Sequence, residues 1–158
     1  MELPIELEWY LVHRKLEPVK PLGEGKDGAV WRHDGGLCAK IHHVRDVYFR
    51  ELHCYRRLRA RRIRHVLGLR VPQLIDHDDD RLIIEMSIVT PPFLLDFASA
   101  YLDTPPDFPA EVLTQWHEEL EGRFGPRYGD VLSVLNELKR TAGIHLFDVH
   151  ADNLKFER

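Results

Sequence analysis

Three glycines, Gly23, Gly25 and Gly28, lie within six positions of the stretch LGEGKDGAVW, which then turns apolar. Glycines at this spacing let a backbone approach phosphate closely, because no Cβ blocks the contact. The stretch therefore predicts a phosphate-binding loop. The spacing alone identifies neither the nucleotide nor the fold, and a turn-rich hairpin without a ligand stays open as the ordinary alternative.

The residues that follow the glycines separate two kinds of phosphate loop. A dinucleotide-binding loop follows a strand and opens directly into a helix, whose N-terminus holds the pyrophosphate. Here Gly28 runs into AVW and then into the turn DGG at residues 34–36, and no helical periodicity begins before residue 46. Asp-Gly-Gly between two apolar runs indicates a hairpin. The context favours a glycine-rich β-hairpin that covers nucleotide phosphates, with Val30 packing on the base.

Apolar periodicity and turn residues predict the elements that must position this loop. A strand-rich first half with one long helix precedes a mainly helical second half, and Gly143 suits the C-terminal cap of the last helix. Helices are expected over residues 5–16, 46–62, 94–101, 107–124 and 130–143, and strands before the glycines, at 28–33, 37–43, 71–78 and 81–89, and on both sides of a polar loop at 148–153.

The composition is that of an ordinary globular chain of 158 residues, 44% hydrophobic and 30% charged. No apolar run approaches the roughly 18 residues that a membrane span needs, and the acidic start MELPIELEWY does not resemble a signal peptide. We therefore expect a cytoplasmic protein without a membrane partner. Cys38 and Cys54 show no disulfide or metal spacing and are expected to be reduced core residues, and the scattered histidines argue against a zinc site.

Charge is distributed unevenly along the sequence. Residues 1–79 hold 15 Lys/Arg against 12 Asp/Glu, whereas residues 80–158 hold 7 against 14. Nine arginines lie between Arg45 and Arg70, most of them in the cluster 50–70. A solvated helix face is the ordinary interpretation. Two others stay open, namely a docking surface for RNA, DNA or an acidic partner, and a surface on which the acidic second half of the chain itself packs.

Taken in order, several motifs resemble the protein-kinase-like fold. The glycine stretch matches G-x-G-x-x-G-x-V, CAKI offers a lysine on the next strand, LIIEM resembles the strand that leads into the hinge, and FDVHADN has the D-x-x-x-x-N spacing of a catalytic loop. The resemblance implies one α+β domain over 1–158. Residues 1–86 would form an antiparallel-sheet small lobe with one helix, and residues 87–158 a reduced, mainly helical large lobe.

The resemblance is better to one branch of that fold. A histidine lies two residues after Asp148, as in the D-x-H-x-x-N loop of aminoglycoside- and choline-kinase-like phosphotransferases and their atypical relatives. Leu146 and Phe147 depart from the His followed by Arg or Gly that the family usually has before the aspartate. An atypical kinase of bacterial style is the better match.

The resemblance also implies roles for individual residues. Lys40 would bind the α- and β-phosphates of ATP, and Glu51, the single glutamate between Lys40 and Glu85, would hold it extended. Asp148 would accept or orient the proton of the attacking hydroxyl, and Asn153 would be an oxygen ligand of Mg²⁺. Taken alone, each of these has an ordinary explanation as a surface, helix or loop residue. The nucleotide-binding residues that the resemblance implies are Leu22, Gly23, Gly25, Gly28, Val30, Ala39, Lys40, Ile84 at the back of the pocket, and the backbone of Glu85 and Ser87 at the adenine edge.

One part of the family pattern is missing. The family places a second metal-ligating aspartate, that of Asp-Phe-Gly, about a dozen residues or more after the asparagine, whereas this sequence ends five residues after Asn153 and contains no Asp-Phe-Gly. We therefore expect a domain that is truncated before that motif.

Three interpretations of that gap stay open. Asp152 or Glu157 replaces the missing metal ligand, or a partner chain completes the site. In the third interpretation the protein binds nucleotide weakly or not at all and is a catalytically silent kinase-like binding module, which could dock an acidic partner or nucleic acid through its arginine-rich helix. Asp152 also has an ordinary explanation as a loop residue that bonds to nearby backbone. The sequence predicts an ATP-dependent phosphotransferase whose hydroxyl acceptor it does not identify, with the silent module as the alternative.

Overall fold

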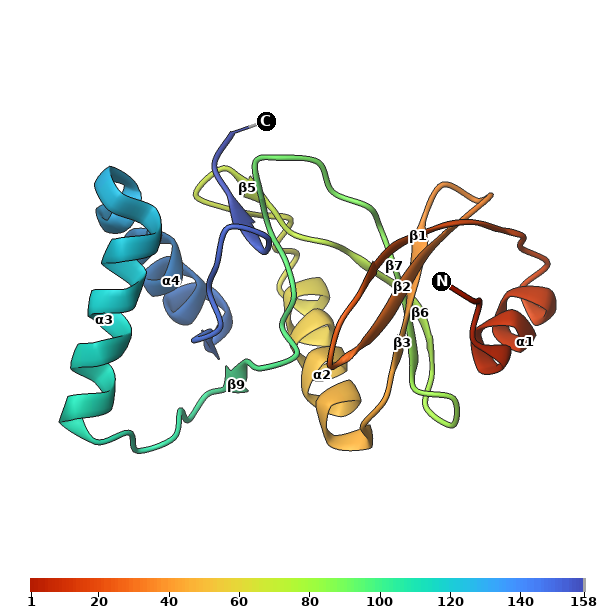
Figure 1. Cartoon of the computed structure of the whole chain (residues 1–158), viewed down its shortest axis with the longest axis horizontal. Coiled ribbons are helices and arrows are strands. Elements are labelled where there is room, and N and C mark those ends of the chain that lie inside the picture. The colour runs from red at the N-terminus through yellow and green to blue at the C-terminus, as the bar shows by residue number, and fades with distance from the viewer. Residues whose placement is uncertain (158) are drawn as a thin grey trace.

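The computed structural model of the protein describes residues 1–157. A five-stranded antiparallel sheet occupies the N-terminal half, with the strand order β1-β2-β3-β7-β6. The two glycine-loop strands lie at one edge, and β3 lies at the centre (Figure 1). The strands are β1 (Pro18–Glu24), β2 (Gly28–His33), β3 (Cys38–His42), β6 (Leu74–Asp78) and β7 (Ile83–Met86).

Helices cover the two faces of this sheet. Helix α1 (Ile5–His13) packs on one face and α2 (Arg45–Ala60) on the other (Figure 1). Strand β3 is buried on both faces, and because side chains alternate along a strand, its residues divide between the two helices. Ala39 and Ile41 belong to the apolar cluster beneath α1. Lys40 contacts α2 from the opposite face.

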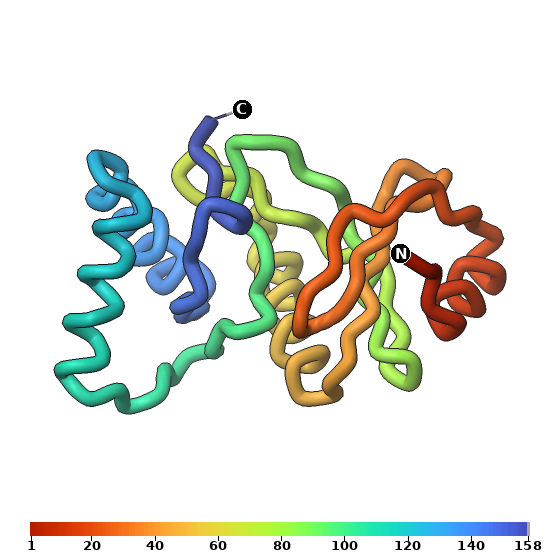
Figure 2. The backbone as a smooth tube through the Cα atoms, in the orientation of Figure 1, coloured from red at the N-terminus to blue at the C-terminus, as the bar shows by residue number. Residues whose placement is uncertain are grey.

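The second half contains short strand ladders and a helical pair. The ladder β11-β8-β5-β4 joins segments that are far apart in sequence, since β8 pairs antiparallel with the C-terminal β11. Figure 2 shows the C-terminal segment running beside the middle of the chain. The remaining elements are β4 (His65–Val66), β5 (Leu69–Arg70), β8 (Phe93–Leu94), β9 (Tyr101–Leu102), α3 (Ala110–Phe124), the short 3-10 helix η1 (Gly125–Arg127), α4 (Tyr128–Ala142), β10 (Ile144–His145) and β11 (Leu154–Lys155).

The two halves share one apolar core. Tyr55 and Leu58 of α2 belong to the same buried cluster as Val134 and Leu138 of α4, so α2 packs against both the sheet and the helical half. By contrast, α3 buries only its Leu120 side chain completely and lies at the outer end of the molecule (Figure 1). Within residues 1–157, no helix combines the length and the apolar character that a membrane crossing requires.

Arginines of the cluster 50–70 reinforce this contact between the halves. Arg57 makes two hydrogen bonds to the Asp103 carboxylate, at 2.9 and 3.0 Å, and one to the carbonyl oxygen of Ala142 at 3.0 Å. Arg61 donates to the carbonyl of Thr141 at 2.8 Å. Both carbonyls lie at the C-terminal end of α4, where cations are favourable. For these two arginines, packing against the chain's own second half is the interpretation that the structure supports.

Most predicted elements are confirmed, including the hairpin around residues 34–36, the helix at 46–62 and Gly143, which caps α4 with a left-handed φ of 65°. The helix predicted at 94–101 is wrong. That segment forms β8 and β9 with turns between them, because long-range strand pairing outweighs its apolar spacing. The hairpin of β4 and β5 was not predicted. Cys38 and Cys54 are free and buried, as expected.

Candidate functional site

A cavity of about 330 Å³ opens beneath the glycine hairpin, and we call it the Lys40 cleft. It lies between the sheet and the segments that connect it to the second half. Apolar side chains form most of its wall, and its charged groups are one lysine and three carboxylates. The lining residues are Leu22, Gly23, Val30, Cys38, Lys40, Glu51, Tyr55, Pro72, Met86, Ser87, Ile88, Val89, Leu95, Asp96 and Asp152.

Lys40 and Glu51 form a buried ion pair at the inner end of the cleft. The Lys40 Nζ atom is 2.8 Å from Glu51 Oε1, and the Glu51 side chain is 1% exposed. Alternation along β3 directs Lys40 toward α2, whose inner face carries Glu51. Burial alone would raise the pKa of Glu51, but the nearby Lys40 and His42 outweigh it and lower the pKa to about 2. Burial lowers the pKa of Lys40, but Glu51 and Asp96 more than compensate, so its net shift is upward.

Two further donors hold the Glu51 carboxylate. The ring nitrogen Nε2 of His42 lies 2.7 Å from Oε1, the same oxygen that contacts Lys40. The backbone N–H of Phe97 donates to the other oxygen, Oε2, at 2.9 Å. Three donors from two segments, β3 and the residues after β8, therefore fix one carboxylate in one orientation.

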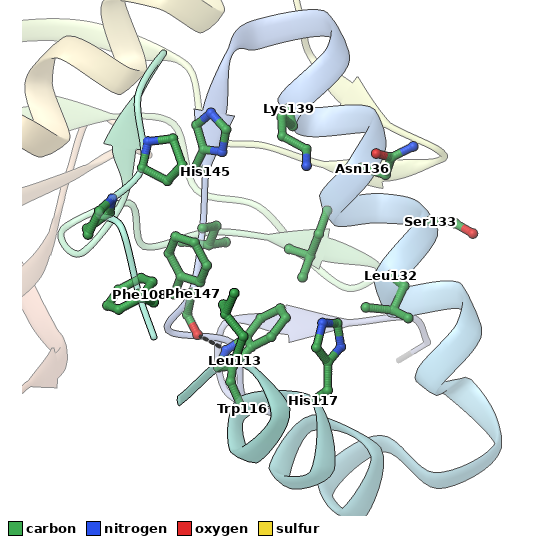
Figure 3. Close-up of a pocket in the computed structure, with 14 residues that line it drawn as sticks. Phe108, Leu113, Trp116, His117, Leu132, Ser133, Asn136, Lys139, His145 and Phe147 are labelled. Atoms are coloured by element: carbon green, nitrogen blue, oxygen red, sulfur yellow. Dashed lines mark hydrogen bonds between the residues drawn. The ribbon is translucent and has the colours of Figure 1, made fainter. Parts of the chain in front are cut away.

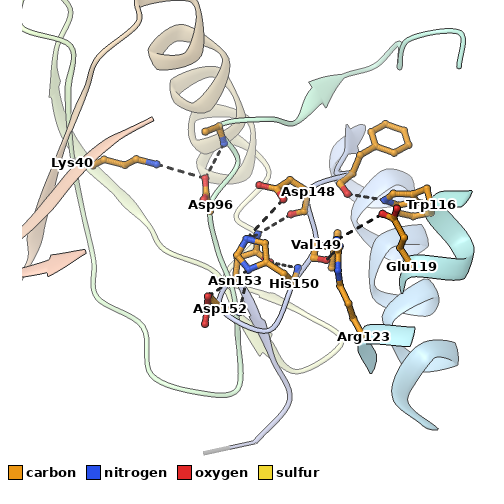
Figure 4. Close-up of polar contacts among 12 residues, drawn as sticks. Lys40, Asp96, Trp116, Glu119, Arg123, Asp148, Val149, His150, Asp152 and Asn153 are labelled. Carbon is orange, nitrogen blue, oxygen red and sulfur yellow. Dashed lines mark hydrogen bonds and ion pairs between the residues drawn. The ribbon is translucent and has the colours of Figure 1, made fainter. Parts of the chain in front are cut away.

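Asp96 is the second acid beside Lys40. Its Oδ1 atom is 3.6 Å from Lys40 Nζ and accepts a hydrogen bond from the backbone N–H of Ala98 at 3.3 Å (Figure 4). Asp96 has a left-handed φ of 70°. This residue lies two positions after the end of β8. The intervening Leu95 N–H donates to the carbonyl of Asn153 at 2.9 Å, so the pairing of β8 with β11 brings Asp96 to the loop at 148–153.

The loop at 148–153 is held mainly by its own backbone and by Asn153. Asn153 is buried, and its Nδ2 donates to the carbonyl of Asp148 at 2.8 Å while its Oδ1 accepts from the N–H of His150 at 2.9 Å. The Asp148 and Asp152 side chains are 43% and 92% exposed. Figure 4 shows the Asp148 side chain directed toward Asp96.

Helix α3 fixes this loop from the outer side. Trp116 Nε1 donates to the carbonyl of Phe147 at 2.8 Å, and Arg123 Nη1 donates to the carbonyl of Val149 at 3.0 Å (Figure 4). These two bonds flank Asp148 in the sequence. The side chains of α3 therefore position the backbone on both sides of the candidate base.

Five of the nucleotide-binding residues expected from the sequence line the Lys40 cleft, and five do not. Gly25 and Gly28 shape the hairpin, since Gly25 N–H donates to the Gly28 carbonyl at 2.9 Å and a Cβ on Gly28 would overlap the carbonyl of Ile41. The lining ones are Leu22, Gly23, Val30, Lys40 and Ser87; the others are Gly25, Gly28, Ala39, Ile84 and Glu85.

The remaining non-lining residues lie in the sheet. Ala39 and Glu85 face α1, where Glu85 accepts hydrogen bonds from Tyr10 at 2.8 Å and Arg14 at 3.0 Å, and Ile84 is in the core. Met86, which is two residues after Ile84 on β7, lines the Lys40 cleft instead. The Ser87 N–H donates to the Gln73 carbonyl at 3.0 Å, which commits that donor within the protein.

Sequence analysis missed Asp96, Met86 and His42. A signal for Asp96 was present, because Asp96-Phe97-Ala98 differs from Asp-Phe-Gly in its last residue only. It was missed because this stretch precedes Asp148 and Asn153 instead of following them. Period-two alternation also places His42 on the same strand face as Lys40.

The donor set suits Mg²⁺ that arrives together with phosphate. This ion takes oxygen ligands and is usually held by one or two carboxylates, waters and substrate phosphates instead of an all-protein cage. Asp96 and Asp152 supply two carboxylates to the cleft. In the part of the chain that the structure describes, no three His, Cys, Asp or Glu residues gather closely enough to hold a metal by themselves.

A second cavity, of about 630 Å³, lies between α3, α4 and the residues before Asp148 (Figure 3). Its walls are mainly aromatic and aliphatic, with Trp116, Phe108 and Phe147 among them, and its polar residues include Lys139 and His145. None of the described residues that line it is a carboxylate, and none is a site residue predicted from the sequence. Of these two cavities, the Lys40 cleft is the one whose described lining residues combine carboxylates with a lysine.

Comparison with known proteins supports the fold. No family model and no curated protein matches this sequence. The chain is similar to the solved structure of the aminoglycoside phosphotransferase APH(2")-IIa in complex with gentamicin, with 17% identity and a TM-score of 0.52 over 89% of this chain and 40% of that one. A ternary complex of APH(2")-IIa with streptomycin and ATP matches at 17% identity and a TM-score of 0.48, over 87% of this chain and 40% of that chain.

The similarity of this chain to the gentamicin complex shows that the chain has a kinase-like fold. This chain spans 40% of the length of that structure.

Proposed function

We propose that the protein is a small kinase-like phosphotransferase that transfers the γ-phosphoryl group of ATP to a hydroxyl group of an acceptor. The observation that best supports this proposal is the gathering of Lys40, Glu51 and Asp96 in one cleft, next to the loop that carries Asp148. Phosphoryl transfer mainly requires positioning and charge neutralisation, which these groups can supply.

Each group has a distinct part in this proposal. Lys40 binds the α- and β-phosphates, and Glu51 keeps its side chain extended. The hairpin of β1 and β2 covers the phosphates and excludes water. Asp148, which is partly exposed beside the cleft, orients the acceptor hydroxyl and accepts its proton.

Asp96 takes the place of the acid that the resemblance put after Asn153. In the family pattern the chain would continue from Asn153 into a strand and then reverse direction, which would return an acid about a dozen residues later to the site. Here β8 pairs antiparallel with β11. This pairing places Asp96 near Asn153, although Asp96 precedes Asn153 in the sequence. On this proposal neither a partner chain nor Glu157 is needed to complete the site.

Asp96 and Asp152 would hold Mg²⁺ together with the nucleotide phosphates, and the ion would neutralise part of the phosphate charge. Asn153 has a different part. Both ends of its side chain already bond within the loop, so in this proposal it keeps Asp148 in position.

That use of Asn153 favours a second candidate function. Because Asn153 bonds within the loop, one Mg²⁺ ligand of the family pattern is missing, and a cleft that holds nucleotide without transferring phosphate would make the protein a silent nucleotide-binding module. The two candidates agree on binding and differ on transfer.

Binding and transfer are tested in turn. We expect Mg²⁺ and ATP at millimolar concentration to raise the melting temperature, and Lys40→Ala to abolish that rise. The matched control Lys20→Ala, on the exposed face of β1, should retain it. No shift for the unmodified protein would overturn both candidates. With binding established, transfer of ³²P from γ-labelled ATP to the protein or to a panel of hydroxyl compounds, lost in Asp148→Ala, supports the phosphotransferase. Binding without any transfer supports the silent module.

A further inference from the structure

The cavity between α3 and α4 has no part in the proposed reaction, and we call it the α3–α4 cavity (Figure 3). Its volume of about 630 Å³ lies within the range of roughly 300–1,000 Å³ that is usual for small-molecule sites. None of the described residues lines both this cavity and the Lys40 cleft. A ligand in the α3–α4 cavity would therefore be separate from the nucleotide of the proposed reaction.

One end of the α3–α4 cavity is aromatic. Phe108, Trp116 and Phe147 gather there (Figure 3). The ring of Phe147 meets the other two edge to face, with centroids 5.0 Å from Phe108 and 5.6 Å from Trp116. All three side chains are only partly buried, and Leu113 beside them is 37% exposed. An aromatic group that fills this end would remove their remaining apolar surface from water, which is favourable.

The other end of the cavity carries a positive charge. Lys139 points into the cavity from α4, at the end where His145 lies (Figure 3). The next residue, Arg140, pairs with Glu137 at 2.6 Å, whereas none of the ion pairs within residues 1–157 involves Lys139. No carboxylate is among the described lining residues. Within the described chain Lys139 therefore lacks a counterion, and an anionic group of a ligand would provide one.

We propose that the α3–α4 cavity is a binding site for an aromatic monocarboxylate. Lys139 binds the carboxylate, and the rings of Phe108, Trp116 and Phe147 contact the aromatic group. The two ends of the cavity thus recognise different parts of one molecule. This inference does not rest on the proposed function, since neither ATP nor phosphoryl transfer enters it.

The aromatic end of the cavity also supports the loop at 148–153. Trp116 Nε1 donates to the carbonyl of Phe147 at 2.8 Å, and Asp148 follows Phe147 directly. A ligand that packs on both rings favours the arrangement in which this bond is made, because that is the arrangement it binds. The bound carboxylate therefore acts as an effector that steadies the loop.

The first test compares two probes of similar shape that differ in charge, 3-phenylpropanoate and 3-phenylpropanamide. NMR titration of ¹⁵N-labelled protein follows the indole N–H signal of Trp116, which is identified by its loss in Trp116→Phe. A probe of this size is expected to bind with a Kd on the order of 1 mM. We expect both probes to shift the signal and the carboxylate to bind about fivefold more tightly, as a solvent-exposed ion pair allows.

Lys139→Gln should remove the difference between the two probes, because it removes the charge and keeps a polar side chain of similar length. Arg140→Gln is the matched control, since it removes a charge one residue away that does not line the cavity, and it should keep the difference. Both positions are exposed, so both variants should fold. Equal binding of the two probes to the unmodified protein, or an undiminished difference in Lys139→Gln, would overturn the proposal.

Two further results of the titration would overturn it as well. Absence of a saturable shift at about 10 mM carboxylate, roughly ten times the expected Kd, would show that the cavity does not take this class of ligand. A Trp116 signal that moves with protein concentration, together with a dimer in sedimentation, would assign the cavity to a second copy of the chain.

Hydrogen exchange tests the effect on the loop. At saturating 3-phenylpropanoate we expect slower amide exchange over residues 146–153, with β7 as an internal reference whose exchange does not change. Unchanged exchange over 146–153 at saturation would overturn the effector role.

Discussion

The two sides of the Lys40 cleft are built in different ways. On the sheet side, the Glu51 carboxylate is buried and fixed by three donors, at 2.7, 2.8 and 2.9 Å. On the other side, the acids of the loop at 148–153 are exposed, and hydrogen bonds to the loop backbone hold them in place. The charges that would meet nucleotide phosphates are thus fixed before any ligand binds. The groups that would meet an acceptor stay open to solvent.

This difference predicts where substitutions will destabilise the protein and where they will change only its chemistry. The sheet side should respond with a large loss of stability, because each of its charges is buried with its partner. The loop side should respond with small losses. The following predictions test this contrast, starting with the largest effect.

Glu51→Ala should have the largest effect on stability. It leaves Lys40 and His42 in the interior without their shared carboxylate, and removal of one partner from a buried ion pair typically costs about 3–5 kcal/mol. The free energy of unfolding in urea measures the loss. Glu118→Ala, an exposed change on α3, should cost less than about 0.5 kcal/mol. Equal stability of the two variants would contradict a central role for Glu51.

Low pH should have the second largest effect, because it removes the stabilisation that the Glu51 carboxylate gives to the sheet side. The pKa of Glu51 is about 2 in the folded protein, below its ordinary value of 4.5. The stabilisation that Glu51 provides is therefore fully present above pH 4.5 and is lost as the pH falls toward 2, because the unfolded chain takes up the proton first. The loss amounts to about 3 kcal/mol over this range.

Urea unfolding at pH 7, 4 and 3 measures the part of this loss that falls above pH 3, about 2 kcal/mol, and Glu51→Gln provides the comparison. The variant has no carboxyl group at this position, so its stability should fall less steeply with acid than that of the unmodified protein. Parallel pH profiles for the two proteins would show that Glu51 is not the group responsible.

Trp116→Phe should have the smallest effect on stability. It removes the Nε1 donor to the Phe147 carbonyl, and a single hydrogen bond of this kind contributes about 1 kcal/mol. We expect faster amide hydrogen exchange over residues 146–153 and little change elsewhere. Trp9→Phe, in the N-terminal helix, should leave exchange in the loop unchanged. Unaltered exchange in Trp116→Phe would mean that α3 does not fix the loop.

Local sequence patterns predicted much of the sheet side. The turn at 34–36, the helix that carries Glu51 and the strand that carries Lys40 all follow from residues close in sequence, and the resemblance to kinases paired Lys40 with Glu51. The structure brings these two side chains within 2.8 Å.

The position of Asp96 could not be predicted in the same way. It depends on β8 pairing with β11, residues 93–94 with residues 154–155, and no local pattern encodes a pairing over that separation. Its apolar neighbours have helical spacing, so the segment was assigned to a helix. The Asp-Phe-Ala sequence was a usable signal, but the family order placed that acid after Asn153. His42 was missed because two adjacent histidines gave no spacing typical of a site.

The central claim is that Asp96 supplies the acid that the resemblance placed after Asn153, and one measurement tests it most directly. The dependence of the ATP-induced rise in melting temperature on Mg²⁺ concentration is compared for the unmodified protein, Asp96→Asn and the control Asp107→Asn, which changes an exposed loop residue. We predict that Asp96→Asn folds and loses the Mg²⁺-dependent part of the rise, while Asp107→Asn keeps it. An unchanged Mg²⁺ dependence in folded Asp96→Asn would contradict the claim.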